Sequence, residues 1–275
     1  MKENVHPTLT PTQIDTYRRE GVLHVPGMFH SWVEHLRQGV AENLRNPSPF
    51  ATINTIEGEQ GFFFDDYCAW ENIETYRNFV FHSGCANLAA QITGAKTIRF
   101  FHEHLVYKSV GTAKATPWHH DLPYYCIQGR QFLSVWIPLD PVPFKNSLRF
   151  VIGSHRDDQL YYPRKFIDGR NYDYDMGDYE SIPDIDKYPE TYPIRQWKMN
   201  PGDAVLFDFR SIHGTSAHPL IHDRRAIAFR WIGEDVVFFR RPGISSPPYP
   251  ELESLRTGDE LPEKLFPIIG QGNNQ

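Results

Sequence analysis

The sequence predicts a mainly β protein, an antiparallel barrel or jelly roll with helices at its N-terminal flank. Aromatic residues make up 14% of the 275 residues and there are 22 prolines, a composition that favours strands joined by irregular loops over a helical bundle. The runs after residue 96 are short, β-branched or aromatic, and separated by Gly, Pro and Asp turns. No helical pattern lies between these runs, so we expect the strands to pair antiparallel.

The first third of the chain is predicted to be mostly helical. Thr10 or Thr12 can cap a first short helix. Residues 30–46 carry apolar side chains at helical spacing, and residues 72–93 form another helical stretch that is broken near Ser83–Gly84. These helices are expected to pack beside the β core.

The remaining elements are predicted to be strands and one long insertion. The strand candidates are TIRFFHEHLVYKS (97–109), QFLSVWIPLD (131–140), SLRFVIGSH (147–155), DAVLFDFRSIHG (203–214) and RRAIAFRWIGEDVVFF (224–239). Residues 156–195 are polar and rich in Tyr and Asp, which indicates an insertion between strands. The simplest organisation is a single domain over 1–275, with a helical flank at 1–95, a core at 96–240 and a C-terminal tail at 241–275.

The composition excludes several classes of partner. The net charge is −6, and the dense basic spots, Arg224–Arg225 and Arg240–Arg241, are too small to track a nucleic acid backbone. No apolar run follows the charged start, and no segment has the roughly 18 apolar residues of a membrane span. The cysteines Cys68, Cys85 and Cys126 are far apart, so we expect free thiols and a cytoplasmic protein.

A metal site is indicated by the stretch TPWHHDLPYY (116–125). Side chains at i and i+2 of a strand point to the same side, so His119 and Asp121 are predicted to face together, with His120 facing away. The third ligand must come from a distant strand, and His213 is the candidate because a strand leads into it and Gly214 allows a tight turn. Two imidazoles and one carboxylate are typical ligands of iron(II) in oxygen chemistry.

An arginine at the start of the next predicted strand supports a carboxylate-bearing cofactor. Arg224 can hold a carboxylate through two parallel hydrogen bonds. Strand parity places Arg224, Ala226, Ala228 and Arg230 on one face, whose small residues leave room for a cofactor. Arg230 is then expected to reach the substrate, and Arg225 is the alternative clamp if the register slips by one residue.

With these motifs the chain resembles the phytanoyl-CoA dioxygenase family of iron(II)/2-oxoglutarate oxygenases. The matching stretches are PWHHDLPYY, VWIPLD, GSHR, GDAVLFDFRSIHG, RRAIAF and the opening LTPTQIDTYRREGVLHVPGMF, and the resemblance runs from about residue 9 to residue 240. It implies a double-stranded β-helix (jelly-roll) core in which iron is held by His119, Asp121 and His213. It also implies that Arg224 holds the C5 carboxylate of 2-oxoglutarate.

The resemblance extends to further cofactor residues. Thr215 matches a hydroxyl that helps to hold the same carboxylate, and Trp136 and Lys108 match positions that line the cofactor in some members. The chain departs from the family pattern in NSLRFVIGSH, where Ser147 replaces a glycine and Ile152 replaces a proline. This departure concerns the local turn and leaves the metal motif intact.

Substrate residues are predicted around the metal motif. Trp118, Tyr124 and Tyr125 flank it and are candidates for the wall of the substrate chamber, with barrel packing as the alternative. Arg130 and Arg230 are candidates to contact the substrate, although Arg130 also fits a charged turn.

Other histidines and acids near these motifs have simpler interpretations. His102 and His104 alternate in FFHEHL and are interpreted as strand residues, because no acid or arginine partner accompanies them. His120 is expected to face solvent or to stand behind the metal ligands. GFFFDDYCAW (61–70) is expected to be a packing loop, with substrate recognition as the alternative.

The sequence therefore predicts an iron(II)/2-oxoglutarate-dependent dioxygenase that oxidises an unactivated C–H bond of a small polar metabolite or natural-product intermediate. The products are succinate, CO₂ and the oxidised substrate, with O₂ as co-substrate and ascorbate as a candidate stimulant. The alternatives are a non-catalytic metabolite-binding jelly roll and an acyl-CoA hydroxylase. Asp121 argues against a halogenase and Arg224 against a zinc hydrolase. The expected partner is a small molecule, and the protein is expected to be a monomer or a homodimer.

Overall fold

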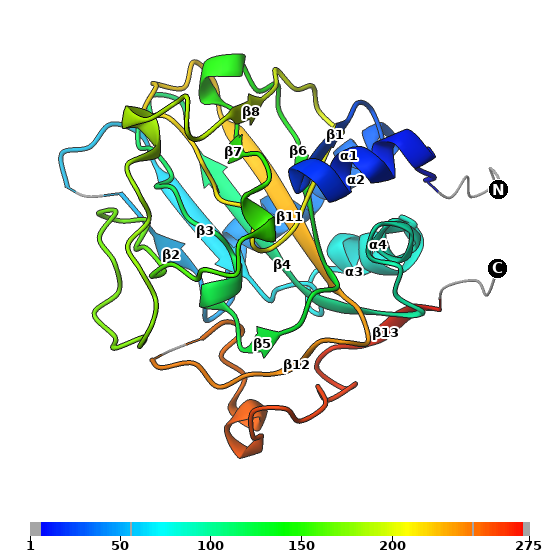
Figure 1. Cartoon of the computed structure of the whole chain (residues 1–275). Coiled ribbons are helices and arrows are strands. Elements are labelled where there is room, and N and C mark those ends of the chain that lie inside the picture. The colour runs from blue at the N-terminus through cyan, green and yellow to red at the C-terminus, as the bar shows by residue number, and fades with distance from the viewer. Residues whose placement is uncertain (1–6, 56, 244, 272–275) are drawn as a thin grey trace.

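A mainly β fold is seen in the computed structural model, which describes residues 7–55, 57–243 and 245–271 (Figure 1). The helices are α1 (Pro11–Glu20), α2 (Val33–Arg45), α3 (Glu74–His82) and α4 (Cys85–Thr93), with 3-10 turns at His30–Trp32, Leu122–Tyr124, Phe144–Asn146, Ser154–Arg156, Ile185–Lys187 and Pro250–Ser254. The strands are β1 (Val22–Val25), β2 (Thr52–Ile53), β3 (Phe63–Tyr67), β4 (Thr97–Lys108), β5 (Ile127–Gln128), β6 (Phe132–Pro138), β7 (Arg149–Val151), β8 (Ile194–Gln196), β9 (Ala204–Phe207), β10 (His213–Gly214), β11 (Arg224–Ile232), β12 (Val237–Phe238) and β13 (Ile268–Gln271).

The strands form one large sheet and two small ones. The large sheet has the order β1-β9-β6-β11-β4-β3-β2, and β13 also pairs with β4. The small sheets have the orders β10-β7-β8 and β12-β5, and every pair of named strands is antiparallel. The helices gather on one side of the large sheet (Figure 1). This arrangement confirms the predicted jelly-roll fold with N-terminal helices.

The helices begin and end where the local sequence predicts. Thr10 caps α1 in a capping box with Gln13, and Gly21 ends the helix at φ 76°. The long helical stretch at residues 72–93 is two helices, because Gly84 at φ 78° turns the chain between α3 and α4. None of the helices in the described part of the chain is long and apolar enough to cross a bilayer.

Strand β11 shows how the sheet separates core from cavity. Ile227, Phe229 and Trp231 are fully buried in the cluster that contains the helices, and Phe229 stacks on Phe79 of α3 with ring centroids 4.3 Å apart. The opposite face carries the alternating arginines and alanines, and Arg224, Ala228 and Arg230 of this face line a cavity. The parity predicted for this strand is therefore confirmed, and one sheet face is left for chemistry.

The N-terminal flank also contains strands that were not predicted. β1 pairs with β9, and β3 pairs with β4, so these strands of the flank extend the large sheet. The predicted loop in GFFFDDYCAW is strand β3, which tolerates Asp66 at 0% exposure because Asn43 Nδ2 (2.6 Å) and the Ser48 amide (2.8 Å) donate to the carboxylate. The strand could not be recognised from the sequence because an acidic residue that is buried in the fold interrupts its apolar residues.

Candidate metal and cofactor site

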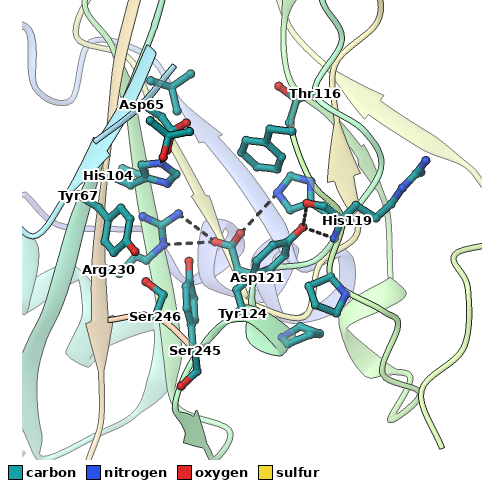
Figure 2. Close-up of a pocket in the computed structure, with 18 of the residues that line it drawn as sticks. Asp65, Tyr67, His104, Thr116, His119, Asp121, Tyr124, Arg230, Ser245 and Ser246 are labelled. Carbon is teal, nitrogen blue, oxygen red and sulfur yellow. Dashed lines mark hydrogen bonds and ion pairs between the residues drawn. The ribbon is translucent and has the colours of Figure 1, made fainter. Parts of the chain in front are cut away.

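His119, Asp121 and His213 meet at the wall of a cavity between the sheets, and Figure 2 labels the first two of them. One ligand atom from each lies within 4.8 Å of the others. Nε2 of His119 is 3.7 Å and Nε2 of His213 is 3.9 Å from Oδ1 of Asp121. All three side chains are buried, so the structure brings together the two imidazoles and one carboxylate that the sequence singled out.

The two histidines are placed by the backbone. The His119 amide donates to the His213 carbonyl at 2.9 Å and the His213 amide donates to the His119 carbonyl at 2.7 Å. Gly214 allows this pairing because a Cβ at that position would lie 2.9 Å from the Thr116 carbonyl oxygen. The glycine thus serves a close approach of two segments, whereas a tight turn was expected.

The chain between the candidate ligands His119 and Asp121 is not a strand. His119 is an isolated bridge residue, and Asp121 has helical angles (φ −72°, ψ −37°) at the start of the turn Leu122–Tyr124. The strand alternation used to pair these residues was therefore wrong, and a turn brings their side chains together. His120 is buried and its Nε2 accepts from the Tyr161 amide at 3.0 Å, so it does not face solvent.

Backbone carbonyls determine the tautomer of both histidines. Nδ1 of His119 donates to the Pro117 carbonyl at 2.8 Å, and Nδ1 of His213 donates to the Ser211 carbonyl at 3.0 Å. Nε2 of each ring is therefore left with its lone pair. Burial, followed by the neighbouring His213, lowers the pKa of His119 to about 3, and burial also lowers the pKa of His213. Both rings are neutral at neutral pH, which is the state that binds metals.

Arg230 occupies one oxygen of Asp121. Its Nε and Nη2 both lie 3.3 Å from Oδ2, which leaves Oδ1 toward the histidines (Figure 2). Burial opposes ionisation of Asp121, but Arg230 and the two histidines outweigh it and keep the pKa of the carboxyl below its usual value. Arg230, which was predicted to contact substrate, lines the cavity and pairs with Asp121.

Two buried cations stand side by side on the neighbouring strands. Arg224 and Lys108 are Cα partners of β11 and β4 and are 5% and 2% exposed. Nη1 of Arg224 donates to the Asn146 carbonyl at 2.7 Å, but among the described residues its Nε has no partner and no carboxylate pairs with it. Burial lowers the pKa of Arg224 to about 10, and burial together with Arg224 lowers the pKa of Lys108. A buried cation without a counter-ion is costly, so this corner is suited to an anion.

The other predicted cofactor residues surround this corner. Thr215 Oγ1 accepts from the Thr116 amide at 2.7 Å, and Lys108 Nζ donates to Thr116 Oγ1 at 3.1 Å. Thr116 and Trp136 of β6 line the cavity, whereas Thr215 and Lys108 are not among its lining residues. Trp136 pairs with Ala228, so the small residue beside the indole keeps the cavity open.

The cavity has a volume of about 340 Å³, and aromatic side chains form part of its walls. Tyr124 and Tyr125 line it as predicted, and the insertion 156–195 adds Phe166, Tyr172, Tyr174 and Met176. Trp118 lies outside the lining, with Nε1 donating to Asp186 at 3.0 Å. Arg130 is also outside it and pairs with Asp158 through side chains that are more than half exposed.

A polar wall of this cavity was only partly anticipated from the sequence, which gave substrate recognition by residues 61–70 as the alternative to packing. His102 and His104 of β4, together with Asp65 and Tyr67 of β3, line the cavity. The available signal was parity, because every second residue of β4 shares the face of Lys108. The interpretation of His102 and His104 as ordinary strand residues overlooked this face.

The chain is similar to a known protein family and to several solved structures. The model of the family described as "Phytanoyl-CoA dioxygenase (PhyH)" matches residues 17–226. Among curated proteins, no significant match was found. Similar solved structures include the α-ketoglutarate-dependent carbocyclase SnoK from nogalamycin biosynthesis (TM-score 0.74, 22% identity, 96% of this chain and 97% of that chain). They also include the epimerase SnoN in complex with Fe³⁺, α-ketoglutarate and nogalamycin RO (TM-score 0.69, 19%, 94% and 98%) and EvdO2 from Micromonospora carbonacea var. aurantiaca complexed with 2-oxoglutarate (TM-score 0.64, 19%, 90% and 97%). At these identities the likeness shows a common fold.

Proposed function

The chain belongs to the phytanoyl-CoA dioxygenase family, and on that premise we propose that this iron(II)/2-oxoglutarate-dependent dioxygenase oxidises a C–H bond of a natural-product intermediate or other small polar metabolite. The observation that carries the proposal is that two neutral histidines and one carboxylate line the same cavity as the buried Arg224, which has Lys108 beside it on the neighbouring strand. Solved structures of similar fold that act in nogalamycin biosynthesis support the substrate class.

The donor set fits iron(II) and the cationic corner fits the dicarboxylate. We assign the metal to His119 Nε2, His213 Nε2 and Asp121 Oδ1, because these atoms converge and the other ring nitrogens are held by backbone carbonyls. We assign the far carboxylate of 2-oxoglutarate to Arg224, whose Nε has no partner among the described residues, with Lys108 behind it. A neutral ligand would leave both charges uncompensated.

The residues around the metal then control how the reactants lie. When bound at this site, iron with O₂ and 2-oxoglutarate would supply the oxidising power, with succinate and CO₂ as the products of the cofactor. Arg224 fixes one end of the cofactor, so that it binds in one orientation. Arg230 holds Oδ2 of Asp121 and keeps Oδ1 aimed at the metal position. Tyr124 and the aromatic insertion enclose the reacting carbon and exclude water.

A matched pair of variants tests the metal assignment. Asp121→Ala should lower the affinity for Mn²⁺, measured by calorimetry, by on the order of a hundredfold and abolish succinate formation. His120→Ala is the control, because His120 is equally buried but its Nε2 is used by the Tyr161 amide. It should retain metal binding and most activity. Equal losses in both variants would contradict the assignment.

A second experiment tests the reaction class. The protein with Fe²⁺, 2-oxoglutarate and O₂ should form succinate, and a library of small metabolites and natural-product intermediates should reveal compounds that stimulate it. Ascorbate is included to keep the iron reduced. Tight zinc binding without succinate formation under any condition would refute the oxygenase function. We further propose a cytoplasmic monomer or homodimer without nucleic acid or membrane partners, on the basis of the acidic net charge of −6.

A further inference from the structure

A histidine and an aspartate form a hydrogen-bonded pair on the cavity wall. Nε2 of His104 lies 3.1 Å from Oδ2 of Asp65 (Figure 2). Asn54 Nδ2 donates to Oδ1 of the same carboxylate. All three residues line the cavity. Neither Asp65 nor His104 takes part in the metal set or in the cationic corner, so this pair is not explained by the proposed binding of iron and 2-oxoglutarate.

The pair fixes which hydrogen bond the imidazole can offer to a ligand. A carboxylate accepts hydrogen bonds, so Nε2 of His104 carries the proton. In the neutral form of the ring, Nδ1 is then the acceptor nitrogen. Within the part of the chain that the structure describes, Nδ1 has no hydrogen-bond partner. The group that completes it has to be a donor.

The same wall holds two more polar atoms without partners. Nδ1 of His102 donates to the Glu103 carbonyl at 2.9 Å, so its buried Nε2 is also an acceptor. Arg230 is the Cα partner of His102, and its Nη1 is buried as well. Neither Nε2 of His102 nor Nη1 of Arg230 has a partner among the described residues. Orphaned buried polar atoms are uncommon in native proteins, which indicates that a polar ligand group belongs at this wall.

Aromatic rings flank the pair and indicate the shape of the ligand. Tyr67 contacts His104 edge-on, with ring centroids 5.8 Å apart, and stacks on Phe50 at 5.3 Å. Tyr172 and Tyr174 stack on each other at 5.8 Å. These four rings line the cavity. Aromatic faces of this kind favour a flat or cyclic apolar body.

We propose that His104, oriented by Asp65, forms a substrate subsite that accepts a hydrogen bond from a hydroxyl group on a ring of the substrate. The inference rests on the proposed function, because it assigns part of the substrate of that cavity. His104 binds the substrate, and Asp65 is a positioning residue that acts through His104. The substrate class is a phenol or a cyclic alcohol.

Two probes test the subsite, and they differ in whether the oxygen on the ring carries a hydrogen or a methyl group. The protein is labelled with ¹⁵N-histidine and loaded with Zn²⁺ and 2-oxoglutarate, which keep it diamagnetic and redox-inactive. It is titrated with 2-naphthol, which can donate a hydrogen bond, and with 2-methoxynaphthalene, which cannot. Wild type should bind 2-naphthol about fivefold more tightly, the effect of one net hydrogen bond. The Nδ1 signal of His104 should move only with 2-naphthol.

The chain offers a matched control in a second histidine–aspartate pair. Nε2 of His24 lies 3.0 Å from Oδ2 of Asp203, and His24 is not among the residues that line the cavity. His104→Phe should remove the preference for 2-naphthol, whereas His24→Phe should keep it. Asp65→Asn should shift the ¹⁵N signals of His104 toward those of an untethered ring and weaken the preference, a change that loss of packing alone would not produce.

Several results would overturn the subsite. These are equal affinity for the two probes in wild type, no binding of 2-naphthol, a preference for the methoxy compound, or a preference that survives in His104→Phe. Zinc-dependent binding of 2-oxoglutarate is measured on the same samples. If wild type shows no zinc-dependent binding of 2-oxoglutarate, this result would count against the proposed function. The comparison of the two naphthalenes would still decide the subsite.

Discussion

Glu103 offers a quantitative test of how the cavity wall is supported. It lies between the two cavity-facing histidines of β4 but points to the opposite face, where it is 0% exposed. Oε1 accepts from the Ala69 amide at 2.6 Å, and Oε2 has no partner among the described residues. Burial raises the pKa of this carboxyl from 4.5 to about 7. Ionisation of Glu103 in the folded state therefore lowers the free energy of unfolding.

The sign of the pH effect follows from proton linkage. Between pH 4.5 and 7 the folded state holds a proton that the unfolded chain has lost, so stability falls as pH rises through this window. At 1.36 kcal/mol for each pKa unit, the total loss is about 3 kcal/mol. Glu103→Gln keeps an oxygen for the Ala69 amide and cannot ionise. The stability of the variant relative to wild type should therefore grow by about 2 to 3 kcal/mol between pH 5 and pH 8.

Urea unfolding of the metal-free proteins at four pH values between 5 and 8 measures this difference. Glu253→Gln is the control, because Glu253 is exposed and its substitution should change stability equally little at every pH. A difference between Glu103→Gln and wild type that stays constant over this range would refute the argument that burial raises the pKa.

Three further predictions concern the metal and cofactor residues. Arg224→Met should lower the affinity for 2-oxoglutarate, measured by calorimetry, by on the order of a hundredfold. It should also raise the melting temperature of the unliganded protein in thermal unfolding, because a buried unpaired charge is removed. An unchanged affinity would contradict the assignment of the cofactor carboxylate to Arg224. The pKa of His119, about 3 in the fold against 6.5 ordinarily, makes the metal-free protein gain stability as pH rises between these values, and His119→Gln should reduce this slope by up to about 1.4 kcal/mol per pH unit in urea titrations. Arg230→Gln should raise the pKa of Asp121 and weaken Mn²⁺ binding about tenfold, more at pH 5 than at pH 8; a loss independent of pH would argue against the pairing.

The elements that the sequence predicted well are those with a long, uninterrupted pattern. Strand β11 alternates bulky and small or charged residues over its whole length, so its two faces could be assigned before the structure. Helix α1 has both a capping box and a terminal glycine. Local chemistry decides such elements, and local chemistry is visible in the sequence.

The features that were missed depend on partners far along the chain. β3 was taken for a loop because Asp65 and Asp66 interrupt its apolar residues, and each acid is buried only through hydrogen bonds from distant segments. The turn at Asp121 likewise could not be inferred from the sequence. The extended segment ends at His119 because His119 pairs with His213, a residue far along the chain. The three metal-site residues were nevertheless selected, because their residue types and their order along the chain do not depend on that local conformation.

The backbone pairing of His119 with His213 has a consequence for how the protein loses and regains its metal. Two reciprocal amide–carbonyl hydrogen bonds join these residues, and each ring is oriented by a carbonyl two residues before it. Peptide groups therefore hold the imidazoles in place, and we expect that the protein folds without the metal. Chelation should remove the metal from an otherwise intact barrel, and reloading should need no refolding. An iron enzyme built in this way can lose an oxidised or mismatched metal and be repaired by simple exchange.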